Sequence, residues 1–166
     1  MKRLLAIAVT LTSFATSEVA AQPDKDAAAQ TANVNLTLIS GPTLTKVADM
    51  TLPNSVVGVT SISVNPITGG SAAAYFILSA QASTPVTVTF SVTPLVLASQ
   101  NPIPFAGVLV GNATDVQTSA TNITPSSTVT TNSSGEYYFW AGGTATPAHD
   151  QGAGAYLGTF SLDVSY

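Results

Sequence analysis

The only histidine of the chain stands beside an acid, in the pair His149-Asp150. Pro147 and Gly152 flank this pair, which indicates a loop. A histidine–acid pair activates a serine only when the serine is held against the imidazole, often at a strained turn. Serine is abundant in the chain, but no Gly-x-Ser-x-Gly turn occurs. The pattern therefore favours a solvated loop histidine, with a hydrolase centred on His149 as the lesser alternative.

Other kinds of catalytic or metal chemistry find little support in the residue types. Hydrolysis by paired carboxylates needs two acids that converge in a cleft, and the acids of this chain are scattered singly. The chain has no cysteine, which excludes disulfides and thiolate metal sites, and its single histidine leaves no metal-ligand spacing. We therefore expect no catalytic residue, no cofactor and no metal site, and a protein that is not an enzyme.

Four consecutive aromatic residues form the segment Tyr137-Tyr138-Phe139-Trp140. In a strand they would alternate, with Tyr137 and Phe139 on one face and Tyr138 and Trp140 on the other. Buried aromatic side chains dominate many sandwich cores, so we expect one of these pairs to fill the core while the other covers the sheet. Glycan stacking on Tyr138 and Trp140, which would make the domain a carbohydrate-binding module, is the weaker alternative.

The start of the chain has the three parts of an export signal. Two basic residues precede an apolar run, residues 4–14, and small residues follow it up to Ala21. We expect cleavage between Ala21 and Gln22, so that residues 1–21 are a signal peptide of bacterial type. The expected destination is the periplasm, the cell surface or the medium of a bacterium, with a Gram-negative host favoured.

Charged residues make up only 7% of the chain, whereas about a quarter is usual for soluble domains. The formal net charge is -4. A negative chain without a stripe of lysine and arginine does not suit a phosphate backbone, which excludes nucleic-acid binding. No segment after the signal is apolar for long enough to form a membrane helix, so we expect no integral membrane anchor.

Short apolar segments with a period of two, separated by glycine, proline and asparagine, fill the rest of the chain. We expect strands at residues 44–50, 56–64, 74–80, 86–92, 105–110, 127–131 and 136–141. Such a series predicts an all-β fold, an antiparallel sandwich with a small β-barrel as the alternative. Residues 22–31 are polar and rich in alanine, which indicates a flexible extension. Residues 32–166 are long enough for a single domain.

The first and last strands alternate most clearly. On one face of the first strand stand Ala32, Val34, Leu36 and Leu38. On the expected core face of the closing strand stand Tyr156, Phe160, Leu162, Val164 and Tyr166. A flexible extension that leads into an alternating strand could complete its own sheet or fill the groove of a neighbouring molecule, and the sequence leaves both open.

Several segments resemble a family of exported bacterial β-domains known as the domain of unknown function four-four-zero-two. The matching motifs are Ala74-Tyr-Phe-Ile-Leu-Ser-Ala80, Val86-Thr-Val-Thr-Phe90, Trp140-Ala-Gly-Gly-Thr144 and Gly154-Ala-Tyr-Leu-Gly-Thr-Phe-Ser-Leu-Asp-Val-Ser-Tyr166. The family's usual Leu-x-Phe-Gly step is replaced by Ala48-Asp-Met-Thr-Leu52. The resemblance covers residues 32–166 and brings no enzymatic residue with it.

The closing strand is also similar to that of spore-coat-U-like and archaic chaperone–usher pilus subunits. This similarity implies an immunoglobulin-like sandwich that a neighbour's N-terminal strand completes, with residues 32–38 as the first or donor strand. We therefore expect a non-enzymatic, exported structural or adhesive protein of the cell surface, possible partners being itself or related subunits. The alternatives are a small outer-membrane β-barrel and a carbohydrate-binding module.

Overall fold

The computed structural model describes residue 36 and residues 40–166. The chain divides into two units, Met1–Leu36 and Thr37–Tyr166. In the first unit only Leu36 is described, and its side chain is 81% exposed. The expected signal peptide with its cleavage site at Ala21 and Gln22, the extension at 22–31, and Ala32, Val34 and Leu38 lie outside the described residues.

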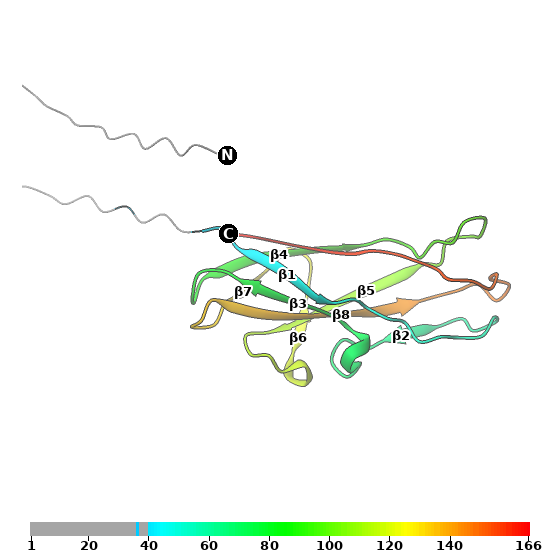
Figure 1. The fold of residues 1–166 in the computed structure, drawn as a ribbon, viewed down its shortest axis with the longest axis horizontal. Helices are drawn as coiled ribbons and strands as arrows, with labels where there is room; N and C mark the ends of the chain where they lie inside the picture. Colours follow the sequence, from blue (N-terminus) through cyan, green and yellow to red (C-terminus); the bar gives the residue numbers. More distant parts are fainter. Residues whose placement is uncertain (1–35, 37–39) are drawn as a thin grey trace, which may run out of the picture. The chain divides into compact units, whose positions relative to one another are not determined.

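The second unit is a sandwich of two antiparallel sheets (Figure 1). The large sheet has six strands, in the order β1 (Thr43–Ala48), β3 (Ala74–Ser79), β8 (Glu136–Ala145), β5 (Phe105–Asn112) and β6 (Thr121–Ile123), with β2 (Ile62–Val64) also paired to β8. The small sheet has three, in the order β7 (Ser127–Thr130), β4 (Pro85–Val92) and β9 (Phe160–Ser165). Two short 3-10 turns, Gly70–Ala72 and Gln117–Ser119, lie in the connections. The strands form two separate sheets. Of the two expected antiparallel architectures, the chain therefore adopts the sandwich.

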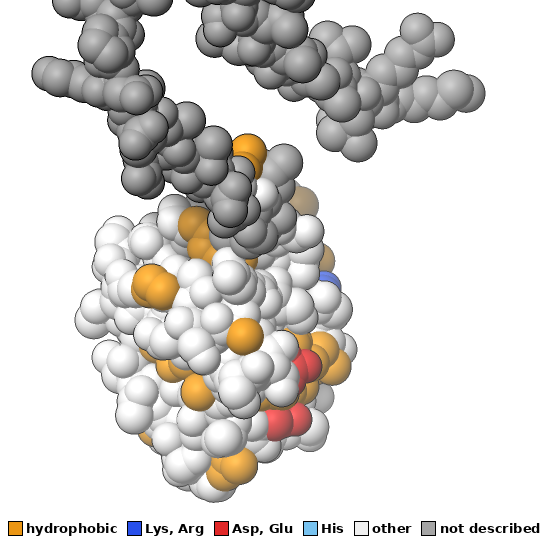
Figure 2. Space-filling view, turned by 90° about the vertical axis from the view of Figure 1, so that its left-hand side faces the viewer, with side chains coloured by type: hydrophobic (Ala, Val, Ile, Leu, Met, Phe, Trp, Pro, Cys, Tyr) orange, Lys and Arg blue, Asp and Glu red, His pale blue; other side chains and the backbone are white. Residues whose placement is uncertain are grey.

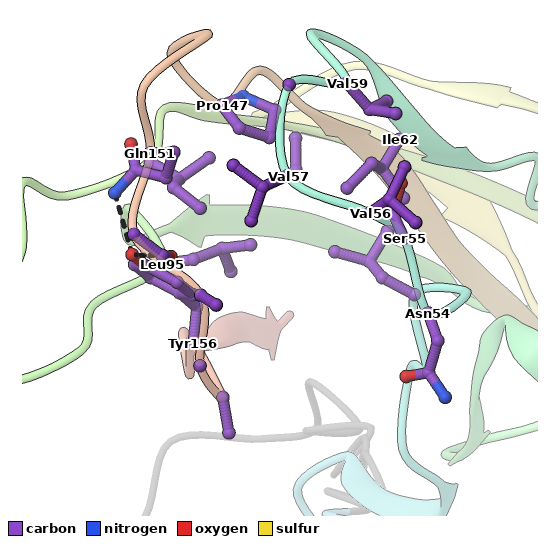
Figure 3. Close-up of a pocket in the computed structure, with 18 of the residues that line it drawn as sticks. Asn54, Ser55, Val56, Val57, Val59, Ile62, Leu95, Pro147, Gln151 and Tyr156 are labelled. Carbon is purple, nitrogen blue, oxygen red and sulfur yellow. Dashed lines mark hydrogen bonds between the residues drawn. The ribbon is translucent and has the colours of Figure 1, made fainter.

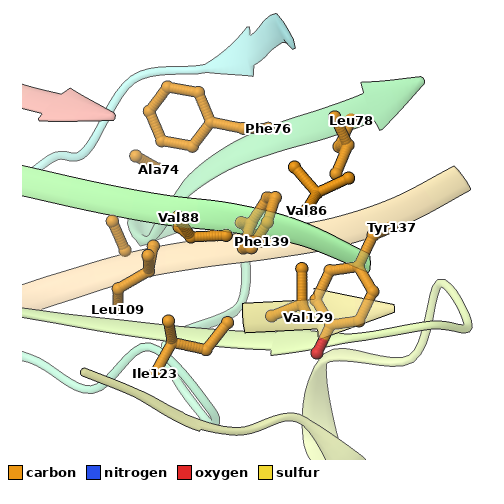
Figure 4. Close-up of a cluster of buried hydrophobic side chains, with 11 residues drawn as sticks. Ala74, Phe76, Leu78, Val86, Val88, Leu109, Ile123, Val129, Tyr137 and Phe139 are labelled. Atoms are coloured by element: carbon orange, nitrogen blue, oxygen red, sulfur yellow. The ribbon is translucent and has the colours of Figure 1, made fainter. Parts of the chain in front are cut away.

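The main core lies between the two sheets (Figure 4). The period of two explains which side chains enter it, since alternate residues of a strand point to the same face. Leu78, Val86, Val88, Leu109 and Phe139 are completely buried there. Burying side chains of this size contributes about 1.5–3 kcal/mol each before ordering is counted. This burial of aliphatic and aromatic side chains holds the sheets together in a chain that has no cysteine.

The aromatic run of β8 divides between the two faces of the large sheet. Tyr137 and Phe139 belong to the main core. Trp140 points to the outer face, where it is only 5% exposed and belongs to a second cluster that also packs Tyr75 and Tyr138. The rings of Tyr75 and Trp140 stack with centroids 5.4 Å apart. The expected alternation is thus present, and the outer face of the large sheet has a small core of its own.

Most of the expected strands appear with small shifts at their ends. The expected segment 56–64 forms a strand only at β2, because a turn occupies Val57 and Gly58, whose φ is +93°. The closing strand begins at Phe160 instead of Tyr156, after a connection that contains Gly158. The three-residue strand β6 was not expected, since Thr121–Ile123 is too short to show an alternation.

The surface of the domain carries few charges. On the face seen in Figure 2, backbone and side chains that are neither hydrophobic nor charged prevail, hydrophobic side chains are scattered and few side chains are charged. Among the described residues one salt bridge forms, between Lys46 and Asp49 at 2.6 Å. No helix within the described part of the chain is long and apolar enough to cross a membrane.

Candidate functional site

Five of the described strands have an unpaired edge, and four of them are poor templates for a further strand. The edge strands β2, β6 and β7 have only three, three and four residues. The edge strand β1 contains a register shift between Lys46 and Ala48, and Lys46 carries a charge. Short strands, bulges and lysine are the usual means by which proteins keep an edge from pairing.

The fifth edge strand, β9, is neither short nor bulged, and its one charged residue is Asp163. Its residues pair with β4 in continuous register from Phe160↔Val92 to Ser165↔Thr87. The strand contains no proline, no lysine and no bulge, and among the described strands it pairs with β4 alone. Of the described edges, β9 is therefore the one that is regular and open to another strand.

The backbone groups on this edge can be assigned from the ladder itself. The N–H of Thr93 donates to the carbonyl of Thr159 at 2.9 Å, so that pair is of the hydrogen-bonded type. In an antiparallel ladder the hydrogen-bonded pairs recur at every second residue. The residues of β9 that bond to β4 are therefore Ser161, Asp163 and Ser165. The N–H and C=O groups of the intervening residues point away from β4, toward the open edge.

Those intervening residues, Phe160, Leu162 and Val164, also point their side chains into the sandwich. All three are only partly buried, although they pack against the main core. Leu44 and Met50 are partly buried in the same core and come from the β1 side of the sandwich. We call the strip of these five partly buried residues, along the neighbouring edges of β1 and β9, the side trench.

The side trench continues into a cavity of about 300 Å³ beyond the start of β9. Met50, Phe105 and Phe160 are among the residues that line this cavity. An extended strand added to β9 would place every second side chain in the trench and its backbone against the free edge. The trench is therefore suited to a strand with alternating apolar residues.

The other two residues expected on the core face of the closing strand, Tyr156 and Tyr166, lie before and after β9. Tyr156 is in the loop before β9, where its hydroxyl donates to the carbonyl of Gly152 at 2.8 Å and accepts from the side-chain amide of Gln151 at 2.9 Å. Tyr166 is 47% exposed. Tyr156 thus supports a loop. Three of the five expected core residues, Phe160, Leu162 and Val164, pack against the main core.

The structure places His149 in an exposed loop, and its ring is close to the backbone of Gly58. None of the hydrogen bonds formed by described side chains involves His149, so no serine is held against it there. Within residues 40–166 and Leu36, no three histidine, aspartate or glutamate side chains come together as metal ligands. The described residues therefore do not assemble a triad or a metal centre.

The outer face of the large sheet brings together groups that sequence reasoning did not connect. The hydroxyl of Tyr138 donates to the Glu136 carboxylate at 2.7 Å, and this hydrogen bond raises the pKa of Tyr138. Burial raises the pKa of Tyr75, and the nearby Asp115 carboxylate adds to the rise. The oxygens of Asp115 do not reach hydrogen-bonding geometry with the Tyr75 hydroxyl, which is buried without a partner.

This face offers a glycan little to stack on. The ring of Trp140 is covered by the second cluster and by Tyr75, so it presents no open surface. Of the two expected stacking residues, only Tyr138 is partly exposed, and its hydroxyl is already bonded to Glu136. The expected carbohydrate platform of Tyr138 and Trp140 is therefore not assembled as two exposed rings.

Comparison of the chain with protein-family models, with curated proteins and with solved structures found no match. The open edge of β9 and the side trench are the features of the described domain that bear on its function.

Proposed function

We propose that this chain is a non-enzymatic, exported structural or adhesive subunit that assembles through the open edge of β9. The observation that carries the proposal is the contrast between β9, which is six residues long and regular, and β1, β2, β6 and β7, which are bulged or short. Natural proteins generally protect exposed edges, so an unprotected edge beside a half-open core is a site for strand addition.

The preferred occupant is residues 32–38, Ala-Asn-Val-Asn-Leu-Thr-Leu, of a second copy of the chain. Its larger apolar residues, Val34, Leu36 and Leu38, have the same spacing as the trench residues Phe160, Leu162 and Val164. A strand of seven residues is about 23 Å long, which suffices to follow the six residues of β9. The polar residues between them would face water on the outer side of the extended sheet.

The same segment could also occupy the trench of its own molecule, and geometry separates the two cases. The hydroxyl of Tyr166 lies 3.2 Å from the carbonyl oxygen of Ser40, so the chain before β1 is next to the end of β9. A segment that reaches along β9 from Ser40 within one molecule must run parallel to β9. A segment from a second copy can run in either direction, including the antiparallel one, which pairs slightly more stably.

The test is the mass of the exported protein in solution, measured by light scattering after size-exclusion chromatography. The variant carries serine at Val34, Leu36 and Leu38, and the matched control carries serine at Asn33, Asn35 and Thr37. The first variant is expected to be monomeric and the control to assemble like the unchanged chain. Deleting residues 22–38 should likewise abolish assembly and leave export intact.

Assembly in trans predicts oligomers that dissociate on dilution. A different result would mean that the strand completes its own domain: the chain is a monomer at all concentrations, and the variant at Val34, Leu36 and Leu38 is less stable than the unchanged chain. Oligomers that form equally well with both triple variants would contradict strand addition altogether.

A further inference from the structure

A cavity of about 440 Å³ lies at the end of the sandwich, beyond the start of β9 (Figure 3). Three segments wall it: the loop that carries Val57, the bridge between Leu95 and Ile103, and the loop that carries Gln151 and Tyr156. In Figure 3, Val57 and Leu95 point into the space between these segments. Small-molecule sites in proteins have volumes of about 300–1,000 Å³, so this cavity is within that range.

Two of the three walls are braced. Leu95 and Ile103 exchange backbone hydrogen bonds of 2.9 and 2.8 Å, and Val96 and Leu157 exchange bonds of 2.8 and 2.9 Å. The side-chain amide of Gln151, which is only 8% exposed, donates to the carbonyl of Asn101 at 2.8 Å. These bonds fix the loops on that side before any ligand arrives, as expected of a preformed site.

The chemistry of the lining selects the class of ligand. No charged residue lines this cavity. About half of the lining residues are aliphatic, including Leu52, Val57, Ile62, Leu95 and Ile103, and Asn54 and Ser55 add uncharged polar groups. The hydroxyl of Tyr156 and the amide of Gln151 are bonded to each other on one wall. A charged group would lose its hydration here without gaining a partner, whereas a hydrocarbon chain would lose only its contact with water.

The shape and the mouth of the cavity agree with a chain-like ligand. The cavity shares Leu52, Leu95 and Tyr156 with the neighbouring cavity of about 300 Å³, so the hollow is elongated. Val56 and Val57 line it and are 77% and 59% exposed. Large aliphatic side chains left this exposed next to a cavity mark an interaction site more often than a bare surface.

We propose that this end cavity binds a neutral, unbranched aliphatic chain, such as the alkyl or acyl chain of a lipid. The proposal does not depend on strand addition at β9. The polar head of the ligand would remain at the mouth or meet the hydroxyl of Tyr156, and the chain would lie along Leu52 and Leu95.

Titration calorimetry of the full chain with primary alcohols of increasing length, from 1-butanol to 1-nonanol, tests the proposal. The dissociation constant should fall about fourfold for each added methylene until the chain outgrows the cavity. Hexanoate and hexylammonium should each bind about tenfold more weakly than 1-hexanol, because the lining has no charge to pair with them. An affinity that does not depend on chain length would overturn the proposal.

Two variants locate the binding. Val57→Asp places a charge at the mouth and should weaken 1-hexanol binding at least about tenfold. Its control is Val116→Asp, at a residue that is 47% exposed and lines neither of the two cavities. Ala155→Leu should shorten the chain length at which affinity stops rising. Equal binding by the two aspartate variants would show that the alcohol binds elsewhere and would sink the assignment.

Discussion

Gly107 of β5 lies directly against the ring of Phe160 in β9. A Cβ atom at Gly107 would be 3.0 Å from Cε2 of Phe160 and would also collide with a methyl group of Val92. The small sheet therefore rests on bare backbone of the large sheet at this point. Since Phe160 also begins the trench, the spacing of the sheets and the shape of the candidate site are set by the same contact.

Gly107→Ala is expected to lower the free energy of unfolding by about 1–3 kcal/mol, because a well-packed core does not accept an extra methyl group without shifts. Gly41→Ala is the matched control, since a Cβ there would meet no atom within 4 Å. Urea denaturation followed by circular dichroism measures both. Equal stability of the two variants would contradict the close approach of the sheets at Gly107.

Neighbouring residues of β5 should respond oppositely to truncation. Leu109 is completely buried between the sheets, and Val108 is 39% exposed on the outer face. Leu109→Ala is expected to lower the free energy of unfolding by about 2–5 kcal/mol. Val108→Ala should change it by no more than about 1 kcal/mol, since its side chain is far from fully buried. Denaturant midpoints compare the two, and a similar loss in both variants would mean that the faces of β5 are assigned wrongly.

Tyr166 joins two distant parts of the domain at the end of β9. Its hydroxyl accepts from the N–H of Gln81 at 3.0 Å and donates to the carbonyl of Ser40 at 3.2 Å. Tyr166→Phe removes both bonds and keeps the ring, so it should lower the free energy of unfolding by about 1 kcal/mol. Hydrogen exchange should show faster exchange of the Gln81 amide. Unchanged exchange at Gln81 would contradict the bond.

The sequence predicts strands well where apolar residues alternate over six or more positions, as in β4. The alternation of Phe160, Leu162 and Val164 predicts which face of β9 is inward, because the period of two is local. It cannot predict which edge of β9 stays open, since that depends on the order of strands in the sheet. The end cavity is equally hidden, because Val57, Leu95 and Tyr156 come together only through loops far apart in the chain.

Alkaline pH should destabilise the domain through its tyrosines. Burial raises the pKa of Tyr137, and the hydrogen bond to Glu136 raises that of Tyr138, so the folded state holds these protons more tightly than the unfolded state. Their contribution is complete below the ordinary tyrosine pKa of about 10 and is lost as pH rises through the folded values. Unfolding free energies measured from pH 8 to 11.5 should fall above pH 10. The fall should be smaller in Tyr137→Phe, and an equal fall in that variant would show that Tyr137 does not contribute.

The direction of backbone groups in β9 can be tested with proline, which lacks an N–H. The N–H of Asp163 faces β4, so Asp163→Pro should break the ladder and destabilise the domain by about 3 kcal/mol or more relative to Asp163→Ala. The N–H of Leu162 faces the open edge, where proline is tolerated. Leu162→Pro should therefore be closer in stability to Leu162→Ala, which corrects for the lost side chain. Chemical denaturation of the four variants gives the two differences. If strand addition occurs at this edge, Leu162→Pro should also weaken assembly more than Leu162→Ala, because one donor to the incoming strand is missing. A larger loss of stability at Leu162 than at Asp163 would reverse the assignment and place the open edge of the small sheet elsewhere.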